Sequence, residues 1–86
     1  MSNVVIYTKD YCPFCHRAKG LLDSKGVTYT EYDIAAQPEL RDEMIEKANG
    51  GSTVPQIFIN NTHIGGCDDM MAIEAQGKLD LSLIHI

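Results

Sequence analysis

Residues 4–22, VVIYTKDYCPFCHRAKGLL, join a short apolar run to a Cys-x-x-Cys pair and then to an amphipathic pattern. The β-branched and aromatic residues of 3–8 predict a buried strand. Pro13 suits the first turn of a helix, where its missing N–H would have had no partner. The apolar positions that follow recur at helical spacing: Cys15, Ala18, Leu21 and Leu22. Gly26 is expected to end this helix. Because the predicted strand precedes the cysteines and the helix follows them, the cysteines should lie where a strand leads into a helix.

The rest of the chain continues the alternation of strands and helices. Residues 27–34, VTYTEYDI, alternate at strand period, and parallel pairing with the first strand would complete a right-handed βαβ unit. Residues 37–51, QPELRDEMIEKANGG, predict a second helix, and residues 53–66, TVPQIFINNTHIGG, predict a hairpin. A final helix is expected over 70–77, preceded by two aspartates. The predicted class is α/β, a four-stranded mixed sheet flanked by helices in the order βαβαββα.

Size and composition limit the classes of protein that this chain can belong to. With 86 residues and 44% hydrophobic residues it is expected to form one small globular domain over 1–80. A net charge of −5 argues against general nucleic-acid binding. The N-terminus, MSNVVIY, carries no pattern of a secretory signal, so a cytoplasmic, thiol-reducing compartment is expected. Three cysteines do not suggest a disulfide framework, which uses an even set.

The last six residues, 81–86, LSLIHI, fit the rest of the sequence poorly. They form an apolar tail without helical patterning, and they resemble the translation of a transposon end used to prepare sequencing libraries. We expect a non-native tail here and exclude it from functional reasoning. The alternative is a genuine apolar terminus that packs on the core.

The Cys-x-x-Cys pair beside a βαβ pattern indicates thiol–disulfide chemistry. Cys12 is expected at the helix N-cap, where unpaired N–H groups and the positive end of the helix dipole favour a thiolate. Lys9 adds a nearby positive charge, which Asp10 partly opposes. Cys15, one turn further along, should lie on the core side of Cys12. The sequence therefore predicts Cys12 as the attacking sulfur and Cys15 as the resolving thiol.

Two other uses of these thiols need weighing. Cys12, Cys15 and Cys67, with either His16 or His63, could in principle supply four zinc ligands. However, a zinc knuckle usually lies in a loop, and the chain has no second Cys-x-x-Cys or His-x-His pair. A structural disulfide is disfavoured in a reducing compartment. Redox chemistry is the preferred interpretation, and a structural zinc domain stays open as an alternative that metal analysis would test.

Three motifs together give a resemblance to a known family. The stretches YTKDYCPFCHRAKGLL, STVPQIFIN and HIGGCDDM, in this order and spacing, resemble glutaredoxins and, within them, the bacterial glutaredoxin 3 group. The match extends from residue 3 to about 80. The resemblance implies a thioredoxin fold, glutathione as the reducing co-substrate, and protein disulfides or glutathione mixed disulfides as substrates. We also expect a monomer that needs no metal, with glutathione reductase acting indirectly.

The resemblance also assigns roles around the cysteines. It implies that Val54 precedes a cis Pro55 facing the active-site sulfur, so that glutathione pairs with the Val54 backbone as a short added strand. Thr53 would lie alongside this strand. Phe14 is expected to form an apolar wall of the binding groove, and Tyr11 can do likewise.

The two ends of glutathione are assigned in the same way. The backbone N–H groups of Cys67 and Asp68, at a helix N-terminus, would bind the γ-glutamyl carboxylate. Asp68 is also expected to be the N-cap of that helix. Lys9 and Arg41 would bind the glycyl carboxylate at the other end. His63 is assigned no role.

Two related classes of protein compete with this interpretation. A thioredoxin-like donor served by a flavoprotein reductase usually shows a W-C-G-P-C pattern, and this chain has no tryptophan. An iron–sulfur carrier resembles C-G-F-S or C-S-Y-C at the active site, and Pro13 and Cys15 disfavour a bridging cluster. A visible absorption spectrum of the fresh protein would distinguish the second class.

Overall fold

The computed structural model describes residues 3–79, and the tail expected to be non-native at 81–86 lies outside the described residues. Seven elements follow one another in the predicted order βαβαββα. They are β1 (Val4–Thr8), α1 (Pro13–Ser24), β2 (Thr30–Asp33), α2 (Glu39–Lys47), β3 (Gln56–Ile59), β4 (Thr62–Gly65) and α3 (Cys67–Ala75). None of the described helices is long and apolar enough to cross a membrane.

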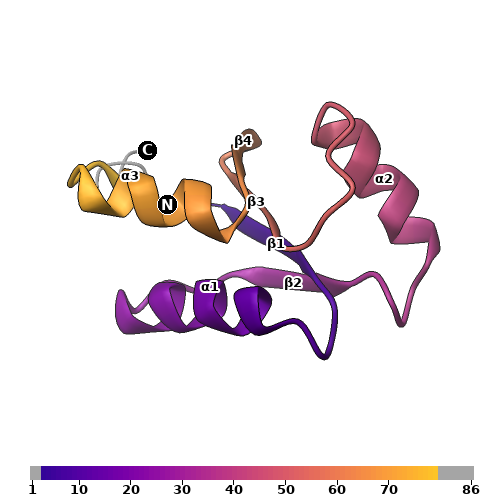
Figure 1. Cartoon of the computed structure of the whole chain (residues 1–86), viewed down its shortest axis with the longest axis horizontal. Coiled ribbons are helices and arrows are strands. Elements are labelled where there is room, and N and C mark those ends of the chain that lie inside the picture. Colours follow the sequence, from indigo (N-terminus) through magenta and orange to yellow (C-terminus); the bar gives the residue numbers. More distant parts are fainter. Residues whose placement is uncertain (1–2, 80–86) are drawn as a thin grey trace.

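The four strands form one mixed sheet in the order β2-β1-β3-β4. β1 and β2 run parallel, as expected for a βαβ unit, whereas β3 pairs antiparallel with both β1 and β4. α1 and α3 contact each other over one face of the sheet, and α2 lies apart from them (Figure 1). This architecture is the thioredoxin fold that the resemblance implies.

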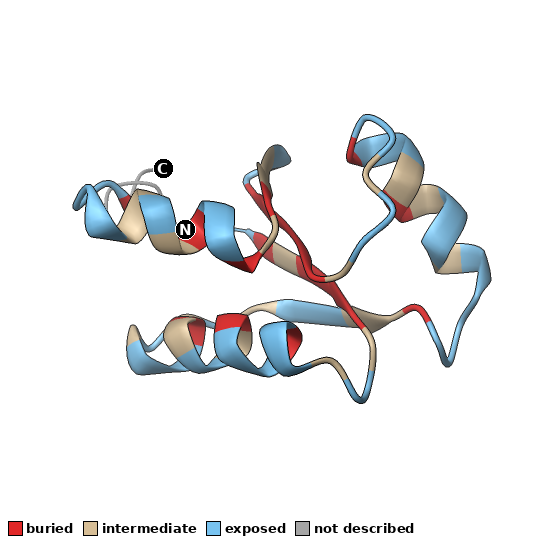
Figure 2. Ribbon diagram, viewed as in Figure 1, coloured by how far each residue is buried: buried red, intermediate tan, exposed pale blue. Residues whose placement is uncertain are grey.

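The alternation of side chains along β1 divides the core into two layers. Val4 and Ile6 face α1 and α3, where they join a cluster with Leu22, Ile57 and Met70. The intervening residues face α2. Their cluster consists of Tyr7, Ile34, Met44, Ala48 and Phe58, with Val5 packed against it. The buried residues therefore follow the central strands and the helix faces turned toward them (Figure 2). Side chains packed on both faces of the sheet fix the ends of β1 and β3. The loops that adjoin these ends are thereby held in place.

The strand expected over 27–34 is confirmed but shorter, because the end of α1 uses its first residues. Gly26, at φ +68°, donates its N–H to Asp23 O at 3.0 Å, and Val27 donates to Leu22 O at 3.2 Å. This pair of bonds is a Schellman motif, which satisfies the last carbonyls of the helix. Pairing with β1 starts only at Thr30, opposite Val5. The first strand likewise begins one residue later than expected, at Val4.

The predicted hairpin is confirmed, with its turn at Asn60 and Asn61. Both residues have positive φ, 52° and 66°, as a two-residue type I′ turn requires. β3 and β4 then pair with a register shift between Ile57 and Phe58. The hairpin brings the segment before α3 next to the segment before β3. Those two segments form the walls of the site.

Candidate active site

Cys12 is the N-cap of α1, as predicted. Its backbone is extended (φ −95°, ψ 112°), and its Sγ accepts a hydrogen bond from the backbone N–H of Cys15 at 3.2 Å. Pro13 follows at the start of the helix, where its fixed φ suits the helical conformation. The sulfur therefore lies at the positive end of the helix dipole. The Cys12 residue is half-buried.

Cys15 lies one turn further along α1 and is completely buried. Burial, and next a hydrogen bond with Cys12, raise the pKa of the Cys15 thiol to about 12. A backbone hydrogen bond from Lys9 and the charge of Lys19 act in the opposite direction. At neutral pH Cys15 is accordingly a protonated thiol. The two sulfurs differ in access to solvent, although they belong to one helical turn.

The loop before β3 approaches Cys12 from the opposite side. The peptide bond between Val54 and Pro55 is cis, as the resemblance implies. The Cys12 thiol donates to the carbonyl oxygen of Val54, with 3.7 Å between sulfur and oxygen. These two residues are 42 positions apart in the chain. Their contact joins the N-terminal βα turn to the wall of a groove.

This groove has a volume of about 470 Å³. Six of the residues singled out in the sequence line it: Phe14, Thr53, Val54, Pro55, Cys67 and Asp68. The Phe14 side chain is 52% exposed and Tyr11, next to Cys12, is 76% exposed. These are the two large apolar side chains most open to solvent among the described residues. Phe14 lines the groove and Tyr11 does not, so the groove has an apolar side at Phe14 and a polar end near α3.

Gln56 and His63 also line the groove; sequence reasoning missed Gln56 and assigned His63 no role. The buried Gln56 amide donates to Thr53 O at 3.0 Å and lies 3.4 Å from Thr53 Oγ1, and its Oε1 lies 2.6 Å from His63 Nε2. Because the Gln56 Oε1 can only accept, His63 Nε2 is the donor. The His63 ring also packs against Phe58, with centroids 5.0 Å apart. Gln56, held by His63, thus fixes the position of the Thr53 backbone.

The polar end of the groove is the N-terminus of α3. The expectation that Asp68 caps this helix is wrong, because Gly66 is the N-cap and Asp69 supplies the capping side chain. Asp69 Oδ2 accepts the Gly66 N–H at 2.9 Å. Asp68 lies exposed in the first turn, and the buried Cys67 precedes it. Burial raises the pKa of the Cys67 thiol. The backbone and not the sulfur of Cys67 is suited to contact a ligand.

The two predicted cationic residues do not line the groove. Lys9 is half-buried before Cys12, and its carbonyl accepts the Cys12 N–H at 3.3 Å. Arg41 is exposed on α2. Contact of either side chain with a ligand stays a prediction.

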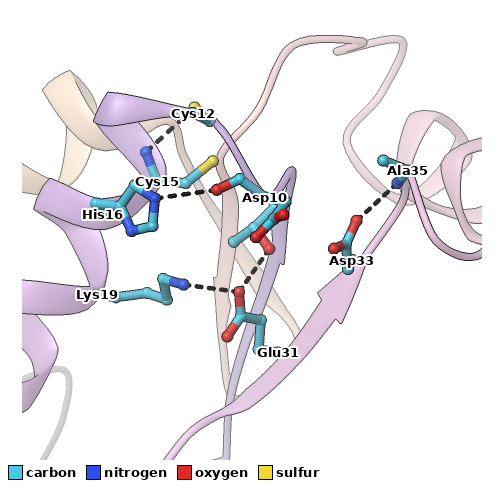
Figure 3. Close-up of polar contacts among 9 residues, drawn as sticks. Asp10, Cys12, Cys15, His16, Lys19, Glu31, Asp33 and Ala35 are labelled. Carbon is cyan, nitrogen blue, oxygen red and sulfur yellow. Dashed lines mark hydrogen bonds and ion pairs between the residues drawn. The ribbon is translucent and has the colours of Figure 1, made fainter.

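The geometry also bears on the zinc alternative. All three cysteines are thiols, and the described residues contain no group of three or more His, Cys, Asp or Glu side chains that could hold a metal ion. His16, one of the candidate ligands, contacts the carbonyl oxygen of Asp10 at 3.0 Å on the exposed side of α1 (Figure 3). The proposed zinc ligands are not gathered at one point.

The chain is similar to known proteins in both sequence and structure. A family model described as Glutaredoxin matches residues 4–64. Glutaredoxin 3 of Escherichia coli (strain K12) is 59% identical over 80 residues, which cover 93% of this chain and 95% of the relative. A solution structure of glutaredoxin from Brucella melitensis has a TM-score of 0.81 at 54% identity, and covers 94% of this chain and 87% of that one.

A more distant structure extends the likeness beyond bacteria. The crystal structure of a buckwheat glutaredoxin–glutathione complex has a TM-score of 0.87 at 33% identity, and covers 95% of this chain and 76% of that one. The resemblance found in the three sequence motifs is therefore confirmed. The chain belongs to the glutaredoxin family of thiol–disulfide oxidoreductases.

Proposed function

We propose that this protein is a glutathione-dependent dithiol oxidoreductase that reduces protein disulfides and glutathione mixed disulfides through Cys12 and Cys15. The observation that carries the proposal is the position of Cys12. Its sulfur is held at the N-cap of α1 by the Cys15 N–H at 3.2 Å and faces Val54 O at 3.7 Å. A nucleophilic thiolate at the wall of a groove can attack a disulfide bound in that groove.

Glutathione is the proposed occupant of the groove. It would extend along the backbone of Thr53 and Val54, with its γ-glutamyl carboxylate at the N-terminus of α3, where the N–H groups of Cys67 and Asp68 are free of intrahelical bonds. Phe14 would cover its apolar part. The buckwheat protein, which has a similar fold, was crystallised as a complex with glutathione. Lys9 and Arg41 stay proposed partners of the glycyl carboxylate.

The monothiol route uses Cys12 alone. Its thiolate attacks the glutathione sulfur of a protein–glutathione mixed disulfide, so that a Cys12–glutathione bond forms and the protein sulfur leaves as a thiolate that takes up a proton. A second glutathione thiolate then attacks the glutathionyl sulfur. Glutathione disulfide is formed, and the Cys12 thiolate is released.

The dithiol route begins with attack of Cys12 on a protein disulfide, which releases one substrate thiolate. Cys15 loses its proton and attacks the Cys12 sulfur, so that a Cys12–Cys15 disulfide forms and the second substrate thiolate leaves. Two glutathione molecules then reduce this disulfide and become glutathione disulfide. Glutathione reductase restores the glutathione, and a cytoplasmic location would supply both.

The test is turnover of a glutathionylated peptide with glutathione, glutathione reductase and NADPH, for wild type and Cys12→Ser. We expect fast NADPH loss with wild type and only the uncatalysed rate with Cys12→Ser, because an unactivated serine hydroxyl is too weak a nucleophile to attack a disulfide at neutral pH. Circular dichroism of both proteins checks that the variant is folded. Absence of turnover with folded wild type, or substantial turnover with Cys12→Ser, would contradict the proposal.

A further inference from the structure

A polar network joins three elements on the core side of the active-site helix. Lys19 on α1 donates to the Glu31 carboxylate on β2 at 2.9 Å, and the buried Thr8 hydroxyl on β1 donates to the same carboxylate oxygen at 2.7 Å. Figure 3 shows Lys19 reaching from the helix to Glu31, on the same side of the helix as Cys15. The side chains of Lys19 and Glu31 are 21% and 36% exposed. Thr8 is 1% exposed.

Lys19 follows Cys15 by four residues on α1, so the two side chains are neighbours on one helix face. The pKa of Lys19 is raised, first by its hydrogen bond with Glu31, so its ammonium keeps the proton at neutral pH. The Lys19 side chain is only partly exposed, so water screens its charge less than that of a fully exposed lysine. A fixed positive charge therefore lies about one helical turn from a completely buried thiol.

The dithiol route makes a demand on that thiol. Cys15 must give up its proton to attack the mixed disulfide, yet burial raises its pKa to about 12. The N-cap geometry that holds the sulfur of Cys12 does not reach Cys15, which lies inside the helix. The backbone hydrogen bond from Lys9 favours the Cys15 thiolate first, and the charge of Lys19 acts in the same direction. Lys19 supplies a positive charge on the helix face that also carries Cys15.

We propose that Lys19, held in place by Glu31 and Thr8, is a positioning residue that stabilises the Cys15 thiolate as it attacks the mixed disulfide on Cys12. The inference rests on the proposed dithiol function. In the step concerned, the Cys15 proton passes to water, the Cys15 sulfur bonds to the Cys12 sulfur, and the bond from Cys12 to the substrate sulfur breaks. The substrate sulfur leaves with the electron pair and takes up a proton.

The other charges near this network are few. Besides Lys19, the groups that act on Cys15 are Cys12 and the Lys9 backbone. Lys19 itself faces Glu31 and, more weakly, Tyr29.

Cys12 acts on the Cys15 thiol in the direction opposite to Lys19, and Glu31 acts on Lys19. Asp33, on β2, acts on Glu31. From α3, Cys67 is affected by Arg17, Asp68 and Cys12. Lys19 is thus the side-chain cation among the groups acting on Cys15, and Glu31 is the anion paired with it.

The resolving step can be observed with the aromatic disulfide dithiobis(nitrobenzoate). Its attack by Cys12 releases one equivalent of coloured thiol and leaves the other on Cys12, and attack by Cys15 then releases the second. All proteins carry Cys67→Ser, so that two thiols can react. The first phase reports Cys12 and the second reports Cys15. An effect on either cysteine is therefore seen separately.

We expect Lys19→Gln to slow the second phase by about three- to tenfold, as loss of one charge near a partly buried anion would do. Below the Cys15 pKa of about 12 the rate of the second phase increases with pH. The curve of this rate against pH should be shifted to higher pH in Lys19→Gln, by roughly half to one unit. Lys19→Arg keeps the charge and should restore most of the rate. Lys25→Gln is the matched control, because Lys25 forms an equally short 2.9 Å ion pair with Glu74 at the other end of α1.

Glu31→Gln separates an electrostatic role from a structural one. Glutamine can still accept from Thr8 and Lys19 but removes the opposing charge, so the second phase should become faster, by about two- to fivefold. The inference would be overturned if the second phase were slowed by the same factor in Lys19→Gln and Glu31→Gln. It would also be overturned if Lys19→Gln slowed this phase no more than Lys25→Gln does. Release of only one equivalent by wild type would overturn the dithiol function itself. Two equivalents without an effect of Lys19→Gln would overturn the role of Lys19 alone.

Discussion

The backbone N–H of Cys15 lies 3.2 Å from the sulfur of Cys12 and donates a hydrogen bond to it. One turn of helix thus places two thiols in different surroundings. The half-buried Cys12 receives the N–H groups and the dipole of the helix end, whereas Cys15 is buried and protonated. An attacking and a resolving thiol need this difference.

Cys15→Ser should separate the two proposed routes. Because deglutathionylation needs only Cys12, the variant should keep turnover of a glutathionylated peptide within about threefold of wild type. It should lose reduction of a protein disulfide, since no thiol resolves the mixed disulfide. Paired assays with a glutathionylated peptide and with insulin measure both. Equal loss of both activities would show that Cys15 also serves the monothiol route.

Gln56→Leu should weaken glutathione binding. The substitution keeps the size of the buried side chain but removes the amide that donates to Thr53 O at 3.0 Å and accepts from His63. Loss of this support should raise the KM for glutathione by about two- to tenfold, the worth of one net hydrogen bond. Gln37→Leu, at an exposed position outside the groove, is the control. An unchanged KM with Gln56→Leu would mean that Thr53 is held by other contacts.

Stability in acid should depend on Glu31. The hydrogen bond from Thr8 and then that from Lys19 lower the pKa of Glu31 below its usual 4.5, against the opposing effect of burial. A depressed folded-state pKa contributes stability that is present above 4.5 and is lost as pH falls through the lower folded-state value.

We therefore expect the free energy of unfolding to fall between about pH 5 and pH 3, and to fall less in Glu31→Gln. Urea unfolding followed by circular dichroism at several pH values measures this. The unfolding free energies of wild type and Glu31→Gln should differ most at neutral pH and converge in acid. A constant difference across the range would show that the charge of Glu31 contributes nothing.

Two glycines should respond to alanine in opposite directions. Gly65 has φ +117°, and a Cβ there would collide with the Asp69 carboxylate that caps α3. Gly65→Ala should lose about 1–3 kcal/mol of unfolding free energy. Gly20 lies exposed within α1 with open space around it, so Gly20→Ala should gain about 1 kcal/mol. Urea unfolding at neutral pH tests both, and a stable Gly65→Ala would mean that this turn can rearrange.

Features that depend on neighbouring residues in the chain could be predicted from the sequence. The N-cap position of Cys12 follows from a strand, Pro13 and a helical pattern within one short stretch, and the turn at Asn60 and Asn61 follows from the tolerance of asparagine for positive φ. The order of the elements came from the same local patterns.

Features that depend on register and packing could not. The length of β2 was overestimated because the Schellman motif takes the Val27 N–H before pairing with β1 begins. The N-cap of α3 was assigned to Asp68, because two adjacent aspartates are equivalent in sequence. Only the backbone direction after Gly65 decides that Asp69 reaches the Gly66 N–H.

The fold class and the thiol at the helix N-terminus could be predicted from residues close in the chain, because strand periodicity, helix capping and turn conformation act over short separations. The tertiary structure alone decided what surrounds those thiols. Val54 faces Cys12, His63 supports Gln56, and Lys19 meets Glu31 through contacts that span 42, 7 and 12 residues. Such pairs are set by strand order and by the packing of α1 on the sheet, and no local pattern encodes the distance between them.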